Sequence, residues 1–161
     1  MTSGGICAVV LSLLVSLKNA RRVRFKSQLQ LDAFHSLQSD LLGYARGKGW
    51  RGEDASRLGL VIEECFMFLC NQDDTDKALT VFIRGGSEDL EVEWVTASAG
   101  ENAEALLLTL DLDTATHAED DLRLKILQSM TDGLVHQQFR DTEFLKVHLT
   151  KKANLPRALG A

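Results

Sequence analysis

The sequence predicts one α/β sandwich of the α+β class, in which a mixed, mostly antiparallel sheet is covered on one face by about three helices. Its 161 residues, 45% of them hydrophobic, have the length and apolar content of a single domain with its own core. Apolar residues recur at helical spacing in some segments and alternate at strand spacing in others. Elements in this order pack as helices against one face of a sheet.

The amino-terminal segment is strongly apolar. Residues 6–17 have the sequence ICAVVLSLLVSL, and Lys-Asn-Ala-Arg-Arg follows at once. No basic residue precedes the run, as it would in a secretory signal, and a complete membrane span needs about 20 apolar residues. Basic residues at the exit of a membrane helix mark its cytoplasmic side. We therefore expect residues 1–24 to be the end of a membrane helix with a basic exit segment. The alternative is a buried or dimer-forming amphipathic helix of a soluble protein.

Two helices are predicted next. The first has an apolar stripe that consists of Phe34, Leu37, Leu41, Tyr44 and Ala45. Three glycines weaken and end it: Gly43, Gly47 and Gly49. Glu53 and Asp54 suit the first turn of the second helix. Its stripe consists of Leu58, Ile62, Cys65, Phe66 and Leu69, and the polar residues 71–76 close it.

The remaining predicted elements begin with a β-hairpin. Residues 79–83 and 90–94 alternate between apolar and polar side chains, and Arg-Gly-Gly-Ser lies between them, which predicts a β-hairpin. A linker rich in Ala, Glu and Asp covers residues 97–118. A third helix is predicted from Leu122, Ile126, Leu127 and Met130, and Gly133 ends it. Two further strands are predicted at residues 134–139 and 143–149, before a frayed tail at 153–161.

Charge and cysteine content narrow the classes of function. The net charge is −5, and all 23 acidic residues follow position 26. Such a surface repels a phosphate backbone, so we expect no nucleic acid partner. The three cysteines, Cys7, Cys65 and Cys70, have no Cys-x-x-Cys spacing, which indicates a reducing compartment and no metal site. The histidines are scattered, without the spacing of a metal site.

Two segments resemble a known family. Residues 49–64, GWRGEDASRLGLVIEE, resemble the segment that leads into the first conserved box of the anti-sigma-factor serine kinase branch of the GHKL ATPases. Residues 121–132, DLRLKILQSMTD, and the strand ending VHLTKK resemble the closing helix and last hairpin of that branch. The likeness covers residues 25–152 and implies a GHKL or Bergerat-like fold, and it leads us to expect a homodimer.

The resemblance also implies a nucleotide site, whose first box is altered here. In such domains an acidic residue and an asparagine four positions later share one helix face; the carboxylate activates a hydroxyl, and the amide oxygen binds magnesium. Glu64 matches the acid, but Phe68 stands at the asparagine position. A phenyl ring cannot bind a hard cation. A register shifted by one would pair Glu63 with Met67, which is equally unsuitable.

The other two boxes are altered as well. Thr96 stands where the family has the aspartate that binds adenine, and of the glycines that follow it only Gly100 remains. Asp121 lies in an acidic stretch, residues 119–121, where the family has a glycine-rich lid over the phosphates. Carboxylates there would repel the phosphates. Asp132, near the end of the third helix, is expected to be structural.

The sequence therefore predicts a catalytically silent, ATPase-like regulatory or protein-interaction domain with no cofactor. The sequence resembles the carboxy-terminal domains that some bacterial xanthine/uracil-type permeases carry after their last span, where Ser-Gly-Gly before an apolar helix is also typical. This likeness places the domain at the cytoplasmic face of the inner membrane, with a protein partner or its own transmembrane domain to bind. The alternative is an active serine/threonine kinase that binds ATP and magnesium.

Overall fold

A computed structural model describes residues 22–70, 77–97, 122–139 and 142–152. In chain order its elements are β1 (Val23–Gln28), the 3-10 helix η1 (Leu31–Ala33), α2 (Phe34–Gly47), α3 (Gly52–Cys70), β2 (Ala78–Gly85), β3 (Asp89–Ala97), α5 (Leu122–Met130), β4 (Gly133–Phe139) and β5 (Thr142–Thr150). The α+β class, the three helices and the four later strands are confirmed. The polar residues 71–76, most of the predicted linker, the frayed tail and residues 1–21 lie outside the described residues.

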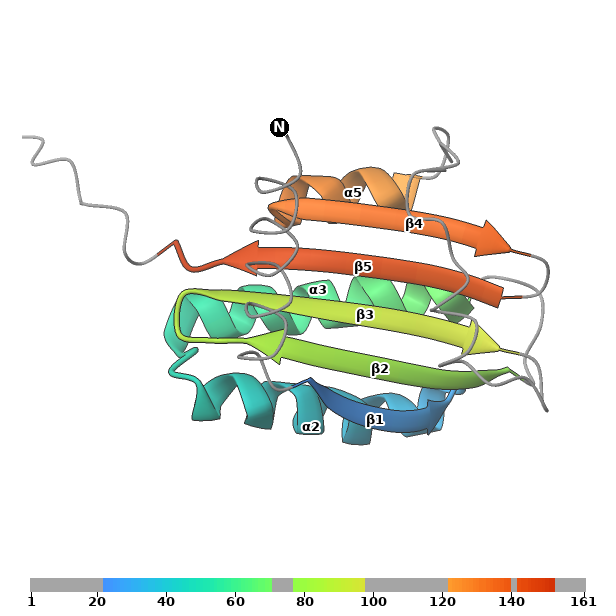
Figure 1. Cartoon of the computed structure of the whole chain (residues 1–161), viewed down its shortest axis with the longest axis horizontal. Helices are drawn as coiled ribbons and strands as arrows, with labels where there is room; N and C mark the ends of the chain where they lie inside the picture. Colours follow the sequence, from blue (N-terminus) through green and yellow to red (C-terminus); the bar gives the residue numbers. More distant parts are fainter. Residues whose placement is uncertain (1–21, 71–76, 98–121, 140–141, 153–161) are drawn as a thin grey trace, which may run out of the picture.

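The five strands form one sheet in the order β1-β2-β3-β5-β4. Sequence analysis expects a mixed, mostly antiparallel sheet, and all four described strand pairs are antiparallel. The strands β2 and β3 form the predicted hairpin, and β4 and β5 form the second one. The three α-helices all lie on the same side of the sheet (Figure 1). Among the described residues, one face of the sheet is therefore covered by helices, and we call it the helix face; the other carries no described helix, and we call it the open face.

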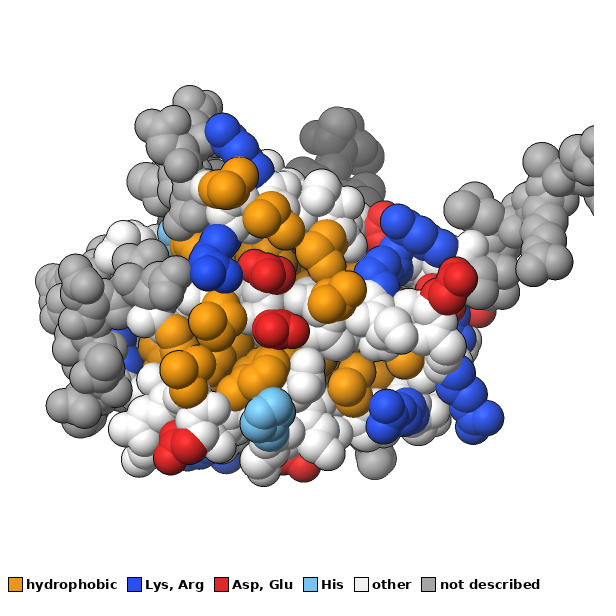
Figure 2. Space-filling model, turned by 180° about the vertical axis from the view of Figure 1, so that it is seen from behind, with side chains coloured by type: hydrophobic (Ala, Val, Ile, Leu, Met, Phe, Trp, Pro, Cys, Tyr) orange, Lys and Arg blue, Asp and Glu red, His pale blue; other side chains and the backbone are white. Residues whose placement is uncertain are grey.

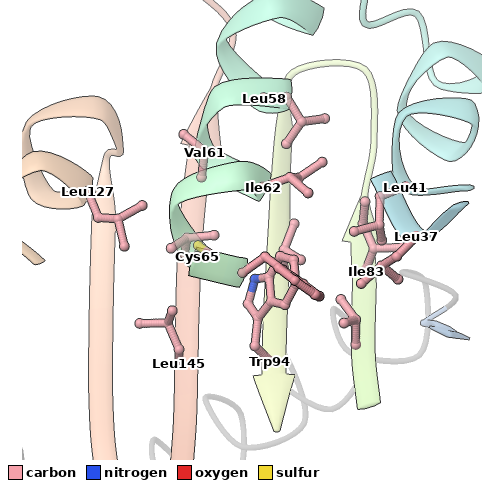
Figure 3. Close-up of a cluster of buried hydrophobic side chains, with 14 of the residues drawn as sticks. Leu37, Leu41, Leu58, Val61, Ile62, Cys65, Ile83, Trp94, Leu127 and Leu145 are labelled. Carbon is pink, nitrogen blue, oxygen red and sulfur yellow. The ribbon is translucent and has the colours of Figure 1, made fainter. Parts of the chain in front are cut away.

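The core lies between the helices and the helix face. Alternate strand residues such as Ile83, Trp94 and Leu145 point toward the helices because successive side chains of a strand face opposite sides. They meet the apolar stripes of α2, α3 and α5, including Ile62 and Leu127 (Figure 3). The helical spacing found in the sequence thus marks the faces that are buried.

The strand β1 is an element that sequence analysis does not expect. It begins at Val23, ahead of the expected domain start at Phe25, so two residues of the proposed membrane exit segment belong to the sheet. Val23 and Phe25 pack partly against the core, whereas Arg24 and Lys26 are exposed. Charged side chains suit this strand because it lies at the edge of the sheet, where they discourage pairing with another chain.

At one end of the sheet, side chains tie the helices to the strands. The Trp50 indole, fully buried between α2 and α3, donates a hydrogen bond from Nε1 to the Gly86 carbonyl at 3.1 Å. Asp54 Oδ1 accepts a hydrogen bond from the Lys152 backbone N–H at 3.1 Å. Asp132 Oδ2 accepts one from the Thr150 N–H at 2.7 Å, so its expected structural role is confirmed. The first two contacts fix the β2–β3 turn and the end of β5 against the start of α3, and the third joins the end of β5 to the residue before β4.

Candidate functional site

The residues that match the family's first box lie on α3, on the side that faces α5. Glu64 and Phe68 are one helical turn apart. The Glu64 carboxylate accepts a hydrogen bond from Arg123 Nη1 of α5 at 3.2 Å, and both side chains are about one third exposed. A guanidinium therefore occupies the position beside the family acid, and α3 and α5 are bridged there. We call this region, with the residues described next, the α3–α5 site.

Phe68 fills the inner part of this site. Its side chain is 2% exposed, and its ring meets the His136 ring of β4 edge to face, with centroids 5.0 Å apart and planes at 89°. This geometry is favourable for two aromatic rings because the edge of one is positive and the face of the other negative. Position 68, which the resemblance aligns with the family's magnesium ligand, therefore holds an aromatic ring packed on a second ring.

A buried carboxyl group lies next to these rings. Glu143 of β5 is 2% exposed, and its Oε1 is 3.3 Å from His136 Nε2, at hydrogen-bond distance. His136 Nδ1 is buried and has no hydrogen-bond partner among the described residues. A buried carboxylate is costly unless it is paired. His136 therefore stabilises Glu143 while its ring also packs on Phe68.

Thr96 uses its hydroxyl within the sheet. The residue is fully buried near the end of β3, and its Oγ1 accepts a hydrogen bond from the Glu143 backbone N–H at 3.2 Å. The two residues are opposite each other in the β3–β5 pairing. The Thr96 hydroxyl, which the resemblance aligns with the family's adenine-binding aspartate, thus contributes to pairing of β3 with β5.

The structure brings three of the five predicted site residues into one neighbourhood. Contacts lead from Glu64 through its helical neighbour Phe68 to His136, then to Glu143 and Thr96. The other two, Gly100 and Asp121, lie outside the described residues, as does the rest of the acidic stretch 119–121. Within the described part of the chain, no group of His, Cys, Asp and Glu side chains is placed to hold a metal ion.

Neither His136 nor Glu143 belongs to a site predicted from the sequence. A signal for Glu143 is present, because it shares the strand phase of Leu145, Val147 and Leu149, all of them buried. A carboxylate in the apolar phase of a strand indicates a buried polar contact. His136 likewise shares the inward phase of β4 with Leu134, which packs against the core.

No protein-family profile matches this sequence, and a comparison with curated proteins finds no matching relative. The likeness to GHKL ATPases therefore rests on the quoted residues and on the order of the elements.

Proposed function

We propose that this chain is a catalytically silent, ATPase-like domain that acts by binding a protein partner. The observation that carries the proposal is the packing of Phe68 against His136 inside the α3–α5 site. Magnesium would need an oxygen ligand at this position. The site instead presents a buried aromatic pair, which packs inside the fold and offers no oxygen atom to a cation.

Two further contacts support this proposal. A nucleotide that used Glu64 would first have to separate it from Arg123. The hydroxyl of Thr96 already accepts the Glu143 N–H, so adenine would compete with a backbone hydrogen bond between the two central strands. Each replaced family residue that the structure describes thus has a structural partner of its own.

The first test is calorimetric titration of ATP and ADP, with magnesium, into the whole chain. The amino-terminal residues are retained because β1 already begins at Val23. We expect no heat of binding and no thermal stabilisation at millimolar nucleotide. Micromolar affinity that depends on magnesium would overturn the proposal and favour the alternative, an active serine/threonine kinase.

A restored site gives a second, independent test. The variant combines Phe68→Asn with glycine at Asp120, Asp121 and Arg123, which would supply the amide ligand and release Glu64. We expect this variant to gain magnesium-dependent ATP binding. The matched control keeps Phe68 and the three glycine substitutions and carries Met67→Asn. This change places the amide at the neighbouring, partly exposed position. Binding by the control alone would mean that the family alignment is shifted by one residue, and no gain in either variant would contradict a degenerate nucleotide site.

The membrane setting is a separate part of the proposal. No helix in the described ranges is long and apolar enough to cross a bilayer. Attachment through residues 1–24, at the cytoplasmic face of the inner membrane and next to a transporter's spans, stays a prediction. Its test is the reading frame upstream of Met1. A series of apolar spans there would support it, and a natural start at Met1 would contradict it.

A further inference from the structure

The open face of the sheet carries an apolar cluster that is separate from the main core. It consists of Phe82, Val95 and Phe144, with Val135 packed against it. These residues alternate with core residues along β2, β3, β5 and β4, so they point away from the helices. Four neighbouring strands thus contribute to one apolar surface.

This cluster is excluded from water. The exposed fractions of Phe82, Val95 and Phe144 are 5%, 0% and 3%. All three described α-helices lie over the other face, as Figure 1 shows, and Figure 2 views the molecule from that helix side. Neighbours in the same sheet cover the sides of a ring but not its outer surface. The outer surfaces of Phe82, Val95 and Phe144 must therefore be covered by apolar residues from another part of the chain.

Arg22, the residue before β1, lies on the open face of the sheet. Its guanidinium lies over the Phe82 ring, 3.7 Å from the centroid, and its Nη2 is 2.8 Å from Glu93 Oε2 of β3. A cation over an aromatic face is attracted by the ring, and the ion pair holds it there. The residue that precedes β1 is thus anchored on the open face, beside the cluster.

The length of the preceding segment fits this surface. Val95 lies two strands away from β1, about 10 Å at the usual strand spacing. Residues 18–21 can span about 13 Å when extended. Residues 6–17 would form a helix of about 18 Å, shorter than the central strands. In a helix, Ser12 and Ser16 would share one face, and Val10, Leu14 and Leu17 would lie on the opposite one.

We propose that residues 6–17 pack against the open face of their own sheet and cover the cluster of Phe82, Val95 and Phe144. The occupant is apolar, as the surface is, and it is joined to the surface by a short basic segment that ends at Arg22. This placement and the predicted membrane attachment through residues 1–24 are alternatives, because the same apolar residues cannot cover the sheet and insert into a bilayer at once. It rests on the geometry of the sheet and is independent of whether the α3–α5 site binds nucleotide.

The test uses the native thiol of Cys7. Cys70 is replaced by serine, and Cys65 is left in place because it is buried and burial raises its pKa, which keeps the thiol protonated and unreactive. A nitroxide attached to Cys7 broadens the NMR signals of nearby amides. We expect the amide signals of Phe82, Val95 and Phe144 to lose intensity, and to regain it when the nitroxide is reduced.

A matched control attaches the nitroxide through Leu60→Cys, at an exposed position of α3 on the helix side, with Cys7→Ser and Cys70→Ser. This label should broaden signals of α3 and α5 and leave the open face unchanged. The proposal is overturned if the label on Cys7 leaves the three open-face signals at full intensity. It is also overturned if the unlabelled chain sediments with phosphatidylglycerol vesicles and deletion of residues 1–21 abolishes that sedimentation.

Discussion

The ring of Phe68 is the basis of the proposal for the α3–α5 site. Phe68 stands where a magnesium ligand would be needed, and it is buried against His136. The proposed loss of a magnesium site therefore rests on a side chain that also contributes packing. Its contribution can be measured as a free energy of unfolding.

Truncation of this ring should be costly. We expect Phe68→Ala to lower the free energy of unfolding by about 3 kcal/mol, because it leaves a cavity beside His136. Urea unfolding at neutral pH measures the change. The control is Leu60→Ala on the same helix, which is 54% exposed and should change stability little. Equal effects of the two substitutions would contradict the packing role of Phe68.

At the residue scale, some residues of the α3–α5 site can be predicted from the sequence, but the contacts between them cannot. Glu64, Phe68 and Thr96 are singled out by a resemblance in local sequence, and the structure brings them into one neighbourhood. The pairing of His136 with Glu143 depends on strand register, and the bond between Glu64 and Arg123 depends on the packing of two helices far apart in the chain. Such contacts are set by tertiary structure, so local patterns do not determine them.

Elements with strong periodicity are predicted well, whereas β1 is missed. The helices α2 and α3 and the β2–β3 hairpin carry long apolar patterns. In β1 only Val23 and Phe25 carry the alternation, and basic residues separate them. The same basic residues that suit an edge strand also suit the exit of a membrane helix, so the residues alone do not distinguish the two.

The β2–β3 hairpin depends on Gly85. This glycine has φ of +142°, and a Cβ atom there would lie 2.9 Å from the Leu90 Cα. We expect Gly85→Ala to destabilise the fold by roughly 2 kcal/mol, since alanine adopts this conformation only with strain. Gly86→Ala is the matched control, because no atom lies within 4 Å of its Cβ position. Thermal unfolding of both variants measures the difference, and similar melting temperatures would contradict it.

Three neighbouring strands are joined on the open face by one carboxylate. Glu91 of β3 lies 2.7 Å from Arg84 Nη2 of β2 and 3.1 Å from Lys146 Nζ of β5. Burial raises the pKa of Glu91, but the hydrogen bonds from Lys146 and Arg84 outweigh burial and hold the pKa below its ordinary value. Because the folded-state pKa is the lower one, the ionised group stabilises the fold above the ordinary pKa of 4.5, and this contribution is lost as the pH falls through the lowered pKa.

Substitution of Glu91 should therefore lower the free energy of unfolding at neutral pH and have little effect on it in acid. We expect Glu91→Gln to lower the free energy of unfolding by roughly 1 kcal/mol at neutral pH, and the difference should shrink below about pH 4. Urea unfolding across this range gives the comparison. Glu63→Gln, at an exposed position of α3, serves as the control. A difference that stays constant with pH would contradict the role of the ion pairs.

On the scale of the whole molecule, the reactivity of two cysteines of α3 should distinguish local access from global unfolding. Cys65 is fully buried, and Cys70 at the end of α3 is partly exposed. Burial raises the pKa of the Cys70 thiol as well, yet reagents can reach it in the native state. We expect an alkylating reagent at mildly alkaline pH to modify Cys70 in the folded protein, and Cys65 only when urea unfolds it. Peptide mass mapping distinguishes the sites, and rapid modification of Cys65 without urea would contradict a rigid core.

The strand order divides the chain into two parts that need each other. Residues 22–97 contain β1, β2 and β3, and residues 122–152 contain β4 and β5. The two parts meet along β3 and β5, from Asp89 opposite Thr150 to Thr96 opposite Glu143. In the first part alone the edge of β3 would be unpaired, and in the second part alone the edge of β5 would be unpaired. These two edges are complementary. The fold therefore offers a split reporter: two separately expressed fragments, fused to a bait and its target, would reassemble through these strand edges and signal that the fused proteins had met.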